Sequence, residues 1–166
     1  MKRILQVGDS ILREKAKEVP ISDISSAKIS KILGEMREAL SKEEDGVAIA
    51  APQIGYSKRI FIVADRSFKQ DDKKFERVYI NPKITKISKD KNLVEEGCLS
   101  VRWKYGVLSR ANKITVEAYN EKAKKFQRGA SGLLAQIFQH EIDHLDGVLF
   151  IDKAKDLIEY RPETAK

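Results

Sequence analysis

The clearest hydrophobic pattern along the chain is helical and lies near its beginning. Between Ile24 and Leu40 the apolar residues recur three or four positions apart, as they do on the buried face of a helix. Asp23 or Ser25 is suited to cap the start of this helix, and Gly46 follows soon after its end. The pattern therefore predicts a helix that faces the core.

Strand patterns follow this helix. Continuous or alternating apolar residues predict strands over residues 59–64, 77–80, 83–88 and 113–119. Asn81-Pro82 is expected to end the second of these strands. Residues 124–128 are expected to pair with the last strand across a turn at Asn120-Glu121, and residues 69–74 form a charged loop.

A second helix is predicted over residues 131–145, where the apolar positions again form one broad face. Ser131 is the predicted cap, and Gly147 suits the end of this helix. The order of helix, strands and helix predicts an α+β domain. Its mainly antiparallel sheet is expected to pack around the second helix.

Composition and charge limit the class of protein. The 166 residues, 42% hydrophobic and 34% charged, fit one soluble domain spanning the chain. No apolar run reaches the roughly 20 residues that cross a bilayer, and the start does not resemble a signal peptide. We therefore expect a cytoplasmic protein. Its net charge of +7 favours contact with RNA, but the basic residues are scattered among acids, as on an ordinary solvated surface.

The candidate chemistry is concentrated in the second predicted helix. The only two histidines, His140 and His144, lie four positions apart, so both rings can reach one metal from one helix face. Glu141 follows the first histidine and can reach a water molecule at that metal. The alternative is a pair of histidines on the helix surface without a ligand.

A catalytic site of this type needs a third protein ligand and an open position. Glu159 and Glu163 lie in a short polar tail and are poor candidates, and Phe150 stands where some metalloproteases have a third histidine. Cys98, the only cysteine, remains. A lone cysteine is most often a small buried hydrophobe, but a Cys/His/His site would explain all three rare residues.

Three segments together resemble the peptide deformylase family. They are Gly-Val-Ala-Ile-Ala-Ala-Pro-Gln at residues 46–53, Glu-Gly-Cys-Leu-Ser at residues 96–100 and Gln-His-Glu-Ile-Asp-His at residues 139–144. Their order and spacing agree with the family, and the resemblance covers nearly the whole chain. It implies an enzyme that removes the N-formyl group from the formylmethionine of new polypeptides and releases formate.

The resemblance implies a role for each motif residue. Cys98, His140 and His144 would hold one divalent metal, with Fe²⁺ expected and Zn²⁺, Ni²⁺ or Co²⁺ able to replace it. Glu141 would accept a proton from the attacking water and pass it to the leaving amine. The Gln53 amide and the backbone N–H of Leu99 would stabilise the charge on the formyl oxygen.

The resemblance also predicts how the substrate is held. Val47, Leu133 and Ile137 would line an apolar pocket for the methionine side chain, with Ala48 and Gly97 beside the substrate. The two helix residues of this set would also suit an ordinary helix core. Glu96 is expected to pair with Arg110 and so to fix the loop that carries the metal-binding cysteine.

The partners implied by the resemblance are N-formylmethionyl nascent peptides. A weak association with the ribosome through the basic surface is possible in addition, and we expect a monomer with no membrane contact. Many bacterial members have a long C-terminal helix, which we do not expect here because the tail is short and contains Pro162.

The chain departs from the family pattern in two segments. Ala48 stands where a glycine is usual, so its methyl group either narrows the cleft or is absorbed by a small shift. Arg102, Trp103 and Tyr105 replace a segment that usually contains proline. Their alternatives are contact with the peptide beyond methionine and, for Trp103, packing against the sheet.

Other functions remain open at this point. A zinc peptidase lacks its usual third ligand here, and a basic RNA-binding protein with structural zinc would need a fourth protein ligand to close the site. A third alternative is a family member in which Ala48 has reduced turnover.

Overall fold

The computed structural model of the chain describes residues 2–68 and 75–163, and it shows the predicted α+β fold. Its described part contains two α-helices, α1 (Ala27–Ser41) and α2 (Gly132–Leu145). Its strands form two antiparallel sheets. The predicted charged loop at residues 69–74 lies outside the described residues.

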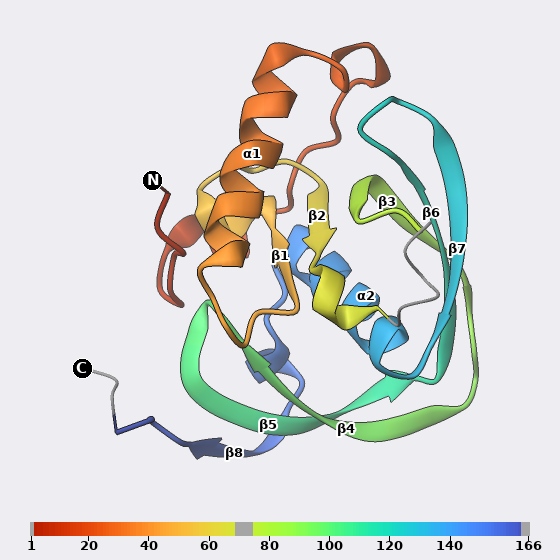
Figure 1. The fold of residues 1–166 in the computed structure, drawn as a ribbon. Helices are drawn as coiled ribbons and strands as arrows, with labels where there is room; N and C mark the ends of the chain where they lie inside the picture. Colours follow the sequence, from red (N-terminus) through yellow and green to blue (C-terminus); the bar gives the residue numbers. More distant parts are fainter. Residues whose placement is uncertain (1, 69–74, 164–166) are drawn as a thin grey trace.

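The larger sheet has the strand order β1-β2-β3-β6-β7, and the smaller sheet has the order β4-β5-β8. In Figure 1 the long β4–β5 hairpin curves beneath α2, while β6 and β7 rise beside it. The strands are β1 (Ala48–Ala50), β2 (Ile60–Val63), β3 (Val78–Ile87), β4 (Lys91–Cys98), β5 (Val101–Ala111), β6 (Lys113–Tyr119), β7 (Lys125–Ser131) and β8 (Lys155–Glu159).

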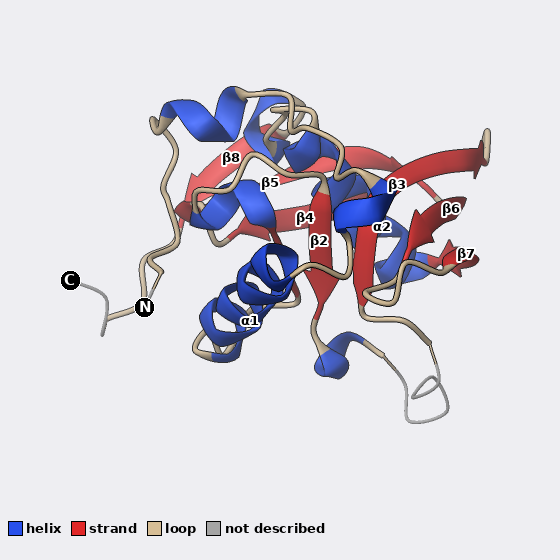
Figure 2. Ribbon diagram, turned by 90° about the horizontal axis from the view of Figure 1, so that it is seen from above, coloured by secondary structure: helices blue, strands red, loops and turns tan. Residues whose placement is uncertain are grey.

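Both faces of the β1–β2 pair are buried, with one helix on each side (Figure 2). Ile49 and Ile62 point into the core cluster that contains the apolar face of α1. Their neighbours Ala50 and Phe61 point into the cluster that contains α2. Successive side chains of a strand point to opposite faces, so a strand buried on both faces is apolar at every position. This explains the continuous apolar run that predicted β2.

Helix α1 starts later than predicted, at Ala27, and Ser26 caps it by accepting a hydrogen bond from the N–H of Ile29. The prediction that Asp23 or Ser25 caps the helix is wrong. Asp23 belongs instead to a short 3-10 turn, Ile21–Asp23, that precedes the helix.

The prediction that Asn81-Pro82 ends a strand is also wrong, because β3 continues through both residues as one strand. The pairing register with β6 shifts between Ile80 and Lys83, which marks a bulge. Asn81 adopts a φ of 53°, and its side chain hydrogen-bonds the N–H and carbonyl of Val19 at 2.8 Å each. A bulge is one of the few places where a sheet accepts proline.

The pairing of β6 with β7 is confirmed, with Tyr119 opposite Lys125 and Lys113 opposite Ser131. Ser131 is therefore the last residue of a strand. It occupies the N-cap position of α2, as predicted, but its side chain makes no capping hydrogen bond. Gly132, with a φ of 57°, makes the change from strand to helix.

The β4–β5 hairpin and β8 were not predicted. Lys91, Asn92, Glu95 and Glu96 interrupt the apolar pattern of β4, and a strand pattern is weak where the strand is largely exposed. The hairpin matters for the candidate site because Cys98 is the last residue of β4.

Candidate active site

Helix α2 and the end of β4 bring the three predicted ligands together. The ligand atoms of Cys98, His140 and His144 all lie within 4.8 Å of one another. The sulfur of Cys98 is 3.2 Å from Nε2 of His144, and the two histidine ring centroids are 5.0 Å apart. A sulfur and two imidazole nitrogens are a donor set that divalent transition metals accept.

The electrostatics of this cluster fit a cation. Burial opposes ionisation of the Cys98 thiol, but His144 and His140 outweigh it and hold its pKa well below the usual value. Burial likewise lowers the pKa of His140, but Cys98 and Glu96 raise it well above the usual value. The site therefore stabilises a thiolate beside positive charge. Metal ligation requires the same thiolate.

Glu96 and Arg110 form the predicted ion pair. Nε and a terminal nitrogen of Arg110 lie 2.7 and 2.8 Å from the two carboxylate oxygens of Glu96. Nδ1 of His140 is 2.7 Å from the same carboxylate. Burial raises the pKa of Glu96, but its bonds to Arg110 and His140 prevail and lower it to about 2. An anionic Glu96 orients the His140 ring with Nε2 available as ligand.

Glu141 is buried in the same pocket as Cys98 and His140. Its side chain is 3% exposed, and its Oε2 has no hydrogen-bond partner within the described residues. Burial raises its pKa, which the neighbouring histidines partly oppose. A buried carboxylate oxygen without a partner is costly for folding, and buried groups with shifted pKa values are concentrated at functional sites.

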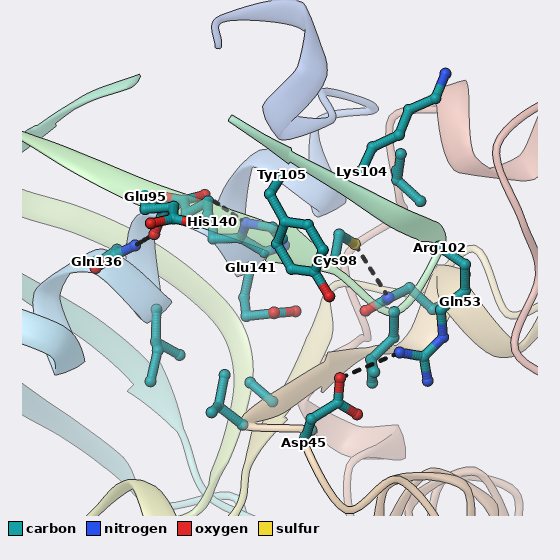
Figure 3. Close-up of a pocket in the computed structure, with 18 of the residues that line it drawn as sticks. Asp45, Gln53, Glu95, Cys98, Arg102, Lys104, Tyr105, Gln136, His140 and Glu141 are labelled. Atoms are coloured by element: carbon teal, nitrogen blue, oxygen red, sulfur yellow. Dashed lines mark hydrogen bonds and ion pairs between the residues drawn. The ribbon is translucent and has the colours of Figure 1, made fainter. Parts of the chain in front are cut away.

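Gln53 lies on a 3-10 helix, Ala51–Ile54, that follows β1 directly. Its Oε1 accepts a hydrogen bond from the N–H of Ala50 at 2.9 Å, which directs Nε2 toward the thiol. Nε2 is 3.0 Å from Oγ of Ser100 and 3.8 Å from the sulfur of Cys98. Figure 3 shows this amide facing Cys98.

Ser100 is a site residue that the sequence analysis did not single out. Its N–H is 3.4 Å from the sulfur of Cys98, and its hydroxyl holds Gln53. The buried Leu99 lies between Cys98 and Ser100 in the turn that joins β4 to β5. The only sequence signal for Ser100 was that it belongs to the same motif as Cys98.

Cys98, His140 and Glu141 line a pocket of about 380 Å³ (Figure 3). Leu133 is 56% exposed at its rim, whereas Ile137 is buried deeper. Gln136, which the sequence analysis missed, also lines the pocket and donates to the carbonyl of Glu95 at 3.0 Å. The predicted residues that line the pocket are Val47, Ala48, Gln53, Gly97, Cys98, Leu99, Leu133, Ile137, His140 and Glu141.

Arg102, Trp103 and Tyr105 form another wall of this pocket, and all three are half-buried. Cys98 pairs with Val101 whereas Gly97 pairs with Tyr105, so the residues between are an irregular insertion in the hairpin. Trp103 has a φ of 68° there. A side chain at Gly97 would approach the Tyr105 ring to 2.7 Å, which explains the glycine.

Arg102 connects this wall to the opposite side of the pocket. Its guanidinium forms ion pairs with Glu43 and with Asp45, the second at 3.3 Å. The guanidinium also lies 4.9 Å from the centre of the Trp103 ring. The insertion is thereby tied to the loop between α1 and β1.

Ala48 is accommodated without strain. It lies in β1 opposite Val63, outside the positive-φ region that favours glycine. It is buried and belongs to the core cluster of Phe61 and Phe138 while also lining the pocket.

An α+β fold with a Cys/His/His cluster and a buried glutamate beside it defines the class of metal-dependent hydrolases. Comparison with known proteins narrows this class. The profile of the family "Polypeptide deformylase" matches residues 1–159. The chain belongs to this family, whose members remove the N-formyl group from nascent polypeptides.

Individual relatives agree along most of their length. The chain is 42% identical over 158 residues to "Peptide deformylase 2" of Clostridium acetobutylicum, covering 95% of this chain and 98% of the relative. It is 44% identical over 151 residues to the peptide deformylase of Halothermothrix orenii, covering 91% and 92%. The crystal structure of peptide deformylase from Thermotoga maritima superposes with a TM-score of 0.81 at 34% identity, covering 93% of this chain and 98% of that one.

Within the described residues, neither α1 nor α2 is long and apolar enough to cross a bilayer.

Proposed function

We propose that formyl removal takes place at a divalent metal held by Cys98, His140 and His144, with Glu141 as the proton carrier. The observation that carries this proposal is the buried Glu141, whose Oε2 has no hydrogen-bond partner in the described residues, beside three converging ligand atoms. Such a metal, when bound, lowers the pKa of water and polarises a carbonyl group.

Glu141 takes the proton of the attacking water and later gives it to the leaving nitrogen of methionine. Its raised pKa makes it a stronger base than an exposed carboxylate, which favours acceptance of the proton from water. The products are formate and a peptide with a free amino terminus.

Gln53 and Leu99 stabilise the oxygen of the formyl group as negative charge develops on it. The Gln53 amide is held with Nε2 toward Cys98 by the N–H of Ala50. The backbone N–H of Leu99 is the second donor. Donors fixed before the reaction need no reorganisation, which is the main source of such stabilisation.

Val47, Leu133 and Ile137 contact the methionine side chain, with Ala48 and Gly97 along the peptide. Their place in one pocket with His140 and Glu141 supports this assignment. An apolar pocket discriminates by only about 1–3 kcal/mol per methylene. We therefore expect related apolar side chains to be accepted as well.

We propose Fe²⁺ as the native metal, with Zn²⁺, Ni²⁺ or Co²⁺ as substitutes, since one thiolate and two imidazoles suit all four. We further propose one catalytic domain over residues 1–166, with α2 at its centre, acting as a cytoplasmic monomer. The net charge of +7 supports a weak association with the ribosome.

Replacing Cys98 by serine is expected to remove the metal and the activity together, because a hydroxyl does not ionise as a thiol does. Loss of a group behind a ligand already costs about 10–100-fold in metal affinity or activity, so loss of the ligand should exceed about 100-fold. Bound iron and formate release from formyl-Met-Ala-Ser would be measured without oxygen. Full metal binding and turnover by the variant would contradict the ligand assignment.

Replacing Ala48 by glycine is expected to change formate release by less than about threefold while lowering the free energy of unfolding by about 0.5–1 kcal/mol. The reason is that glycine in a strand loses more conformational freedom on folding than alanine. The loss of the Ala48 methyl group from the core acts in the same direction. Urea unfolding and steady-state kinetics test the two parts. A tenfold gain in kcat/KM would instead show that this methyl group narrows the cleft.

A further inference from the structure

A short N-terminal segment, residues 5–7, is hydrogen-bonded to two segments of the active site. These are the 3-10 helix that carries Gln53 and the β4–β5 turn. The N–H of Leu5 donates to the carbonyl of Gln53 at 2.8 Å, and the N–H of Val7 donates to the carbonyl of Ser100 at 2.7 Å. In Figure 1 this segment, at the red end of the chain, lies beside the turn between β4 and β5. The segment therefore contacts the active site from outside the pocket.

The side chain of Gln6 makes two further bonds to the β4–β5 turn. Its Nε2 donates to the carbonyl of Leu99 at 2.8 Å. Its Oε1 accepts from the N–H of Arg102 at 3.2 Å. One amide thus bridges the turn and fixes the direction of the Leu99 carbonyl. The carbonyl of Leu99 lies in the peptide unit that follows this residue, and its N–H lies in the unit that precedes it. With the carbonyl held, only φ and ψ of Leu99 remain to reorient the N–H.

We infer that Gln6 is a positioning residue for formyl removal, whose amide orients the turn so that the Leu99 N–H faces the developing negative charge. This inference rests on the proposed function of Leu99. Gln6 itself lies outside the pocket lining and does not reach the reacting atoms.

The position of Gln6 separates orientation from core packing. Its side chain is exposed, so it buries little apolar surface. The Cys98 thiol also has a neighbour outside the turn, since its sulfur lies 3.2 Å from Nε2 of His144. Loss of the Gln6 amide should therefore affect the oxyanion donor and leave metal binding intact.

Two variants test this role. Gln6→Met keeps the length of the side chain and removes both bonds, whereas Gln6→Glu retains the acceptor for Arg102 and loses the donor to Leu99. Complete removal of one oxyanion donor costs about 10²–10³-fold in kcat. A displaced donor should cost less, so we expect about a tenfold fall in kcat for both variants. KM should stay within about twofold, because the interaction forms in the transition state.

The assay is steady-state formate release from formyl-Met-Ala-Ser by iron-loaded protein. Co²⁺ binding, followed by the thiolate-to-metal absorption band, and the urea midpoint of unfolding are measured on the same variants. Gln127→Glu is the matched control for kcat, because Gln127 is an exposed amide on β7 and undergoes the same charge change. Its urea midpoint is not compared, because the new carboxylate would face Glu117 across the two strands. The control variant should retain wild-type kcat.

The outcomes are distinguishable. A tenfold fall in kcat with unchanged Co²⁺ affinity and midpoint supports the inference. Wild-type kcat in Gln6→Met overturns the inference and leaves the proposed function intact. A loss of Co²⁺ affinity in parallel with the loss of kcat has the same meaning. Absence of formate release by the wild type overturns both.

Discussion

Replacing Glu141 by glutamine is expected to lower formate release from formyl-Met-Ala-Ser by about 100-fold or more, the usual contribution of a positioned proton carrier. Glutamine has nearly the same shape but cannot take a proton. Glu141 is buried, and its Oε2 has no partner in the described residues. The amide should therefore fit without disrupting packing, and kcat should fall while the iron content stays at one per chain.

The control for this variant is Glu38→Gln, the same chemical change on the exposed face of α1, where Glu38 pairs with Lys42 at 3.2 Å. It should retain full activity. An activity of Glu141→Gln within a few-fold of wild type, at equal iron content, would contradict the assignment of Glu141 as the proton carrier.

Replacing Arg110 by methionine is expected to lower the free energy of unfolding by about 3–5 kcal/mol, as when one partner of a buried ion pair is removed. The side chains of Arg110 and Glu96 are 4% and 5% exposed, so the carboxylate would remain buried without its cation. Arg110 also contacts Asp143 at 2.7 Å. Because Glu96 holds Nδ1 of His140, metal affinity should fall as well, by about 10–100-fold.

Urea unfolding of the metal-free protein measures the stability effect without a contribution from metal binding. Arg37→Met provides the comparison, since Arg37 pairs with Glu121 at 3.0 Å but both side chains are 48% exposed. An exposed pair contributes about 0–1 kcal/mol. An equal fall in the free energy of unfolding in the two variants would show that the buried pair is no more stabilising than the exposed pair.

The sequence predicted those parts of the fold whose signals are local. The helical spacing of apolar residues in α1 and α2 and the buried run of β2 depend on one segment each. The cap at Ser26 was missed because several nearby residues could serve, and the choice depends on how the preceding 3-10 turn packs. The bulge at Asn81 depends on its bonds to Val19, 62 positions away in sequence.

The site was predictable to the extent that its residues form motifs. Residues 96–100 and 139–144 contain all three ligand candidates, and the structure brings these together. The Arg102 ion pairs and the Gln6 bridge are different, because each joins segments more than 50 positions apart. No periodicity or spacing in the sequence marks such contacts.

Ala48 shows how a motif departure can be resolved by packing. The sequence left open whether its methyl group narrows the cleft. In the structure β1 has an ordinary strand conformation at this position, and the residue is buried against the Phe61 cluster. The structure therefore gives no support to the alternative that Ala48 reduces turnover by straining the strand.

The most direct test of the central claim is to incubate the iron-loaded wild type, prepared without oxygen, with formyl-Met-Ala-Ser and to identify the products. The account predicts formate and intact Met-Ala-Ser with a free amino terminus. Cleavage of the Met-Ala or Ala-Ser bond, or no formate from a protein that binds one metal per chain, would contradict it.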